Sequence, residues 1–140
     1  MAIEYYRNQK QIYIMAEEKF PGKIEIGLST GETWARKYRD SKDEESKKKI
    51  NSYLIPLESL EAVLRLKKTL EIDAVRAYIG VNELGEQNLI FVGTKLDEKT
   101  GIYKDVFAKG ESEENGGGDV VYDGSRPCPP YGDPGSPMNE

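Results

Sequence analysis

The sequence predicts an α+β fold, in which a small antiparallel sheet (a hairpin or meander) packs against two or three helices. Three observations predict it: two strand-like runs joined by a short turn, an amphipathic helical run just before them, and a change of composition near residue 110. We therefore expect a single α+β domain over residues 1–109. Residues 110–140 form an acidic C-terminal tail that holds seven of the 14 glycines and five of the seven prolines.

Residues 72–94 predict the hairpin around which the rest of the domain is organised. From Val75 to Val81 apolar residues alternate with Arg76, Tyr78 and Gly80, the period of two that is typical of a half-buried strand. Residues 89–94 are a second run of strand-forming residues, and the segment between the two runs contains the turn residues Asn and Gly. Residues 102–107 follow another turn and predict a third strand, which would extend the hairpin to a meander.

Residues 57–70 predict the clearest helix. One apolar stripe is formed by Leu57, Leu60, Val63, Leu64 and Leu70, with glutamates near the N-terminus and lysines near the C-terminus, as the helix dipole favours. A lone hairpin is marginal in water, so we expect this helix to cover one of its faces. The predicted core is Leu60, Val63, Leu64, Val75, Ile79, Ile90 and Val92.

The segments before this helix are less regular. Residues 3–20 favour a helix, although residues 11–16 also have strand-like content, and residues 24–28 suggest a short strand or an extended segment. Ser29 and Glu32 have the spacing of a capping box and predict a helix that runs to about Arg39. In that helix we expect Trp34 to be a core anchor. Residues 40–49 contain no apolar residue and predict a solvated loop or a frayed helix end.

The chain has no histidine and a single cysteine, Cys128. These counts exclude Ser-His-Asp and Cys-His nucleophile systems, histidine-ligated zinc sites and an internal disulfide. The acidic turn at residues 97–101 does not fit a calcium-binding EF-hand loop, because Leu96 and Glu98 stand where that loop needs aspartate. We therefore expect no catalytic residue, no metal site and no cofactor.

Charge is distributed unevenly along the chain. The net charge is −5; residues 111–140 hold seven acids and one base, and residues 1–110 hold 18 acids and 19 bases. A nearly neutral body with an acidic tail argues against a nucleic-acid partner. The apolar runs are too short to span a bilayer, and the N-terminal residues lack the pattern of a secretory signal, so we expect no membrane partner and a cytoplasmic location.

Two groups of residues are candidates for partner binding. In the predicted hairpin, Arg76 and Tyr78 share one face, where they can hold an anion or where the arginine stem can cover the ring. In the tail, residues 120–122 can add a strand to an open sheet edge, and residues 126–131 favour extended polyproline II structure. The candidate residues are Arg76, Tyr78, Val120, Val121, Tyr122, Arg126, Pro127, Pro129, Pro130 and Tyr131.

Two arrangements of the tail are open. The tail is either an appendage without contacts to the domain, or residues 120–122 pair with the edge of the domain's own sheet while residues 129–131 cap the core. The predicted function is that of a non-enzymatic binding or adaptor protein that contacts another protein through a sheet edge or through the proline-rich tail. The alternative is a binder of a small anionic ligand or a carboxylate-dependent enzyme, with Arg76 and Tyr78 at its site.

Three short patterns suggest a family. They are Val-Arg-Ala-Tyr-Ile-Gly at residues 75–80, Leu-Ile-Phe-Val-Gly at residues 89–93 and Pro-Cys-Pro-Pro at residues 127–130. Together they resemble a group of short uncharacterised bacterial proteins with an Arg-x-Tyr strand, a Leu-x-x-Val-Gly strand and a C-terminal Cys-Pro-Pro-x-Cys tail. The resemblance implies architecture and no activity. Gly132 stands where the second cysteine of that tail would be, which removes any two-thiol redox or metal role.

Overall fold

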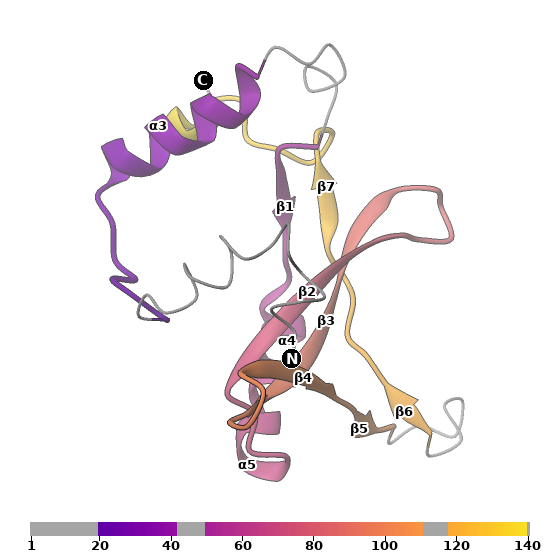
Figure 1. Cartoon of the computed structure of the whole chain (residues 1–140). Coiled ribbons are helices and arrows are strands. Elements are labelled where there is room, and N and C mark those ends of the chain that lie inside the picture. The colour runs from indigo at the N-terminus through magenta and orange to yellow at the C-terminus, as the bar shows by residue number, and fades with distance from the viewer. Residues whose placement is uncertain (1–19, 42–49, 111–117, 140) are drawn as a thin grey trace.

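The computed structural model describes residues 20–41, 50–110 and 118–139, and these residues form an α+β fold built on antiparallel sheets (Figure 1). The helical elements are α3 (Leu28–Arg39), α4 (Leu57–Leu64), α5 (Leu66–Thr69) and the 3-10 turn η4 (Pro137–Asn139). The strands are β1 (Ser52–Leu54), β2 (Ala74–Val81), β3 (Gln87–Asp97), β4 (Ile102–Val106), β5 (Ala108–Lys109), β6 (Asp119–Val120) and β7 (Arg126–Cys128). The helix expected over residues 3–20 and the loop expected over residues 40–49 lie almost wholly outside the described residues.

The central sheet has the antiparallel order β2-β3-β4, which confirms the predicted hairpin and its extension to a meander. Strand β2 pairs with β3 from Ala74 opposite Thr94 to Val81 opposite Gln87. The turn between them is held by the Asn82 side chain, whose Oδ1 accepts hydrogen bonds from the main-chain N–H groups of Leu84 and Glu86, both at 2.9 Å. This contact is the local reason for a hairpin, because an asparagine side chain can replace a main-chain acceptor in a tight turn.

Helices α4 and α5 cover one face of the central sheet. Val63 and Leu66 from the helices are buried with Ile72 and Phe91 and form the core. Gly93 leaves room for Ile72 and for Leu66 of α5: a Cβ atom at this position would lie 2.7 Å from Cγ2 of Ile72 and 3.3 Å from Cδ1 of Leu66. The predicted packing of this helix on the hairpin is confirmed, and the helical run is interrupted at Arg65.

The predicted core is only partly right. Val63 and Val92 are buried and Leu60 and Ile90 are half-buried, whereas the exposed fractions of Leu64, Val75 and Ile79 are 59%, 38% and 70%. The helix packs mainly on β3, so the side chains of Val75 and Ile79 on the edge strand β2 stay exposed. Val92 lies on the opposite face of β3 from Phe91, since side chains alternate along a strand. Leu66, which the prediction omitted, takes a central place instead.

The described part of the tail belongs to the fold. Strand β6 pairs with β5, β7 pairs with β1, and Tyr122 exchanges main-chain hydrogen bonds with Phe91 of β3 at 2.7 and 3.1 Å. The tail therefore continues along the edge of β3 at the point where β4 departs from it. The appendage arrangement does not describe residues 118–139. Their contacts agree with the alternative in that Val120 and Tyr122 pair with neighbouring strands, but Pro129, Pro130 and Tyr131 are exposed instead of capping the core.

Helix α3 lies apart from the central sheet and packs against η4 at the C-terminal end of the described chain (Figure 1). It begins at Leu28 with Gly27 as its N-cap and with no side-chain capping hydrogen bond, so the predicted helix to Arg39 is confirmed but the expected Ser29 capping box is wrong. Residues 24–27 form no strand, and Gly27 has an extended backbone. None of its residues is buried, and Trp34 is 58% exposed instead of anchoring a core. A helix of this kind can expose its tryptophan because the short turn η4 covers only part of its surface.

Candidate functional site

The candidate residues of the hairpin and of the tail occupy separate places. Arg76 and Tyr78 lie on β2, on the face of the sheet away from the helices, as their alternation predicted. Tail residues 120–131 run along the edge of β3 that faces away from β2, and they pair with β1 and β5. No single site in the described structure brings the two groups together.

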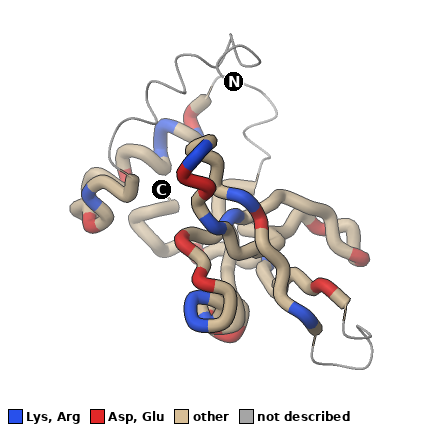
Figure 2. Tube along the Cα trace, turned by 60° about the horizontal axis from the view of Figure 1, so that its bottom comes forward, with Lys and Arg blue, Asp and Glu red and all other residues tan. Residues whose placement is uncertain are grey.

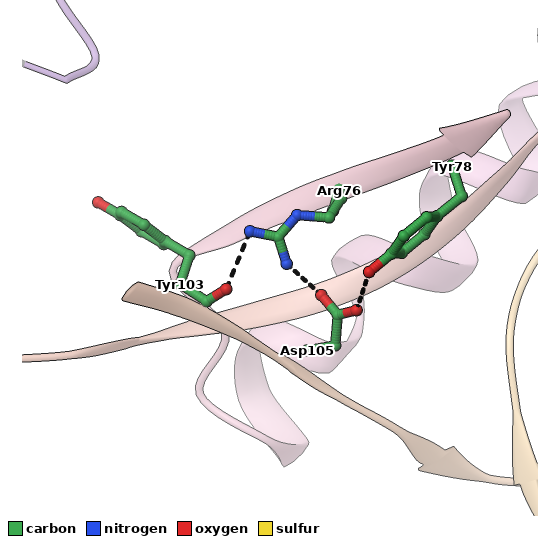
Figure 3. A network of polar contacts seen from close by, with 4 residues as sticks. All are labelled: Arg76, Tyr78, Tyr103 and Asp105. Carbon is green, nitrogen blue, oxygen red and sulfur yellow. Dashed lines mark hydrogen bonds and ion pairs between the residues drawn. The ribbon is translucent and has the colours of Figure 1, made fainter. Parts of the chain in front are cut away.

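Arg76 and Tyr78 are joined by Asp105 of strand β4 (Figure 3). The Arg76 guanidinium forms an ion pair with one carboxylate oxygen of Asp105 and also donates a 2.9 Å hydrogen bond to the main-chain oxygen of Tyr103. The Tyr78 hydroxyl donates to the other carboxylate oxygen of Asp105. These contacts link the two outer strands across β3, whose residues Val92 and Thr94 pair with Arg76 and Asp105.

The network also defines the electrostatics of this face. The hydrogen bond to Asp105 is the main reason why the pKa of Tyr78 is raised above its usual value of 10.0. The Arg76 side chain is 39% exposed and the Asp105 side chain 20%, so the charge pair is only partly screened by solvent. An anionic ligand would have to compete with Asp105 for the guanidinium. Asp105 was not among the predicted site residues. Its spacing from Tyr103 on the predicted third strand places both residues on one face, but only the tertiary structure shows that this is the face of Arg76 and Tyr78.

The outer edge of β2 is a second feature of the hairpin. In the described part of the chain, β2 pairs with β3 on one side and with no strand on the other. The main-chain N–H of Asn82 donates a 2.9 Å hydrogen bond to the main-chain oxygen of Glu86. This bond shows which residues of β2 form hydrogen bonds with β3. Main-chain groups alternate in direction along a strand, so the even-numbered residues of β2 bond to β3 and the odd-numbered ones point outward. By the same alternation, the main-chain N–H and C=O groups of Phe91 point away from β2, and they bond to Tyr122 instead.

Four residues present these outward main-chain groups, and all four have exposed apolar side chains: Val75, Ala77, Ile79 and Val81. Ile79 and Val81 are 70% and 74% exposed. Proteins usually protect edge strands with proline, lysine or a bulge. Residues 74–81 contain neither proline nor lysine, and their pairing with β3 is continuous. We call this set of four residues the β2 edge.

The candidate residues of the tail make contacts within the protein. Val120 pairs with Ala108, and Tyr122 is bound to Phe91. Pro127 is buried and pairs with Tyr53 in the β1-β7 ribbon. The extended run expected over residues 126–131 is therefore a short strand followed by a turn. The exposed members of the group are Val121, Arg126, Pro129, Pro130 and Tyr131.

Cavities lie elsewhere in the described structure, and two of them are lined by residues of the helices and of the tail. The larger, of about 550 Å³, lies between the α4-α5 helices and the β5-β6 ribbon; the smaller, of about 270 Å³, lies between α3, β1 and the end of the tail. Arg76 lines neither of them. No group of three or more potential metal-ligating side chains occurs among the residues that the structure describes. Acidic and basic residues are interspersed along the described chain (Figure 2).

Comparison with protein-family models, with curated proteins and with solved structures finds no match for this chain. The resemblance of its three short patterns to a group of bacterial proteins stays a prediction. Within the described ranges, no helix is long and apolar enough to cross a membrane.

Proposed function

We propose that this protein is a non-enzymatic binding protein that contacts another protein chain through the β2 edge. In this mode of recognition, called β-augmentation, an extended segment of the partner adds a strand to an open sheet edge. Main-chain hydrogen bonds supply affinity, and the side chains that alternate along the edge supply specificity. The cytoplasmic location expected from the sequence stays a prediction.

One observation carries the proposal: the residues with outward main-chain groups are the same residues whose apolar side chains are exposed. Val75, Ile79 and Val81 would contribute hydrogen bonds and apolar contacts to one partner strand at the same time. An exposed hydrophobic edge without proline, lysine or a bulge is a site of strand pairing, and the one charged residue of β2, Arg76, is already paired with Asp105. Of the two contact sites predicted from sequence, the sheet edge has more support than the tail, because Pro127 and Tyr122 are already used within the protein.

The anionic-ligand alternative has less support. It needs a free cation beside Tyr78, and Asp105 already binds both Arg76 and Tyr78. It also needs a concave site with converging polar groups, whereas Arg76 lines neither of the two cavities described above.

Site-specific photo-crosslinking in the cell that encodes the protein tests the proposed function. A photoreactive phenylalanine analogue replaces Ile79 in one variant and Leu84 in the other. Leu84 is a matched control, because it is 72% exposed but lies in the turn beyond the β2 edge. We expect adducts with a protein chain, whether another protein or a second copy, from position 79 and few from position 84.

Equal adduct yields at the two positions would contradict the use of this edge. Turnover of a small substrate by the purified protein, abolished by Asp105→Asn or Tyr78→Phe, would overturn the non-enzymatic proposal and favour the alternative.

A further inference from the structure

We propose that the chain bound at the β2 edge is the β2 strand of a second copy, paired antiparallel about a two-fold axis at Tyr78. This inference rests on the proposed function and names the partner. The two three-stranded sheets would then join into one continuous sheet of six strands.

The direction of the main-chain groups restricts the pairing. Only Val75, Ala77, Ile79 and Val81 point their N–H and C=O groups outward, so an outward residue must lie opposite an outward residue of the second copy. Of the two-fold arrangements that satisfy this condition, one uses all four residues. It places Val75 opposite Val81 and Ala77 opposite Ile79 of the second copy. If the register shifts by two residues, either Val75 or Val81 of each copy no longer lies opposite an outward residue of the other copy.

The side chains fit this register on both faces of the sheet. On the face that the helices partly cover, the smallest side chain, Ala77, meets the largest, Ile79. Both residues are exposed in the single chain, so the pairing would bury apolar surface that now faces water. On the other face, Arg76 lies beside Gly80 of the second copy, which has no side chain to oppose it. The two Tyr78 rings, each on a residue 45% exposed, meet at the axis.

The charge of the strand also favours a second copy. Arg76 is the only charged residue of β2. Its guanidinium is already paired with Asp105 of the same chain, so two copies bring no unpaired like charges together along the strand. Strands that face each other with like charges are destabilised, and β2 avoids that penalty against itself.

Sedimentation of the full-length protein across a range of concentrations tests the inference. We expect a reversible equilibrium that reaches the mass of two chains. Ile79→Lys removes two symmetry-related apolar pairs and should weaken this dimer by about tenfold or more. Leu84→Lys is the control, because it makes a similar change at a similarly exposed residue outside the strand, and it should leave the dimer unchanged. Circular dichroism and melting curves confirm that both variants are folded.

Disulfide trapping tests the register. In the proposed arrangement Tyr78 lies opposite itself at a non-hydrogen-bonded position, where Cα atoms are roughly 4.5 Å apart, within the range that a disulfide spans. Tyr78→Cys should therefore form a covalent dimer on mild oxidation. Ala77→Cys and Ile79→Cys would each lie opposite themselves only in the two shifted registers, so both should react more slowly. The natural Cys128 is buried, and the unmodified chain should give little dimer.

The outcomes separate this inference from the proposed function. A chain that stays monomeric at all concentrations but still forms adducts at position 79 in the cell would overturn the self-pairing and leave the binding function standing. A dimer that Ile79→Lys does not weaken, or that forms disulfides fastest through Ala77→Cys or Ile79→Cys, would overturn this interface or its register. A monomer without adducts at position 79 would overturn both proposals.

Discussion

The Ser125 hydroxyl takes the place of a neighbouring strand for Leu89. It accepts a hydrogen bond from the Leu89 main-chain N–H at 2.7 Å and lies 3.3 Å from the Leu89 main-chain oxygen, to which it donates. Ser125 is completely buried. One side chain of the tail thus satisfies both main-chain groups of a β3 residue at a point where β4 has already left the sheet.

Removing this hydroxyl should destabilise the protein. Ser125→Ala leaves both main-chain groups of Leu89 without their partner in a place closed to water, and an unsatisfied buried group costs about 1–3 kcal/mol. Urea denaturation measures the change in the free energy of unfolding. Ser52→Ala is the control, because Ser52 is exposed, and its effect should stay within about 0.5 kcal/mol. Equal stabilities of the two variants would show that the contact contributes nothing.

Leu64 at the end of α4 and Leu66 at the start of α5 provide a matched test of the core. Leu66→Ala truncates a side chain that is 6% exposed and packs against Gly93 and Ile72, so it should cost about 2–5 kcal/mol. Leu64→Ala makes the same change at a residue that is 59% exposed, and its effect should be much smaller. Thermal and urea unfolding measure both. A larger loss for Leu64→Ala would mean that the helix presents a different face to the sheet.

Removal of the tail should destabilise the domain. A chain of residues 1–110 loses the Tyr122 contact with β3, the β1-β7 pairing and the Ser125 hydroxyl, so its melting midpoint should fall by at least about 5 °C. The bared edge of β3 should also promote aggregation.

The control for this truncation is the full-length chain with Glu111, Glu113 and Glu114 replaced by Gln. It reduces the acidity of the tail without removing the pairings of residues 118–139, and its midpoint should change little. If the shortened chain had the same melting midpoint as the full-length protein, the tail pairings would contribute nothing to stability.

The contact between Tyr78 and Asp105 should appear in the pH dependence of stability. The pKa of Tyr78 is raised in the folded protein above its usual value of 10.0, chiefly by the hydrogen bond to Asp105, so the fold favours the neutral phenol. This stabilisation is fully present below the pKa of the unfolded chain and is lost as the pH rises through the higher pKa of the folded state.

Tyr78→Phe should remove this loss. Unfolding midpoints measured from about pH 8 to about pH 11 should fall less steeply for this variant than for the unmodified protein. Tyr131→Phe is the control, because Tyr131 is similarly exposed but is outside the network, and it should keep the steep fall. Identical profiles for Tyr78→Phe and the unmodified protein would contradict the coupling.

Local patterns in the sequence determined the elements of the central sheet. Alternation predicted the hairpin and placed Arg76 and Tyr78 on one face, and the spacing of apolar residues predicted the helix before it. Turn residues such as Asn82 and Gly85 marked the connection. Each of these features depends on residues close together in the chain, and for that reason the sequence alone predicts them.

Tertiary structure alone decided where the elements lie. Periodicity shows that Val75, Ile79 and Leu64 belong to apolar faces, but it does not show that the helix covers β3 and leaves β2 open. In the same way, the glycine and proline content of the tail indicated that the tail is separate from the domain. In the structure, Ser125, Tyr122 and Pro127 bind the tail to strands that are distant in sequence. Long-range pairing depends on the three-dimensional fit of both partners, and a local sequence pattern describes only one partner at a time.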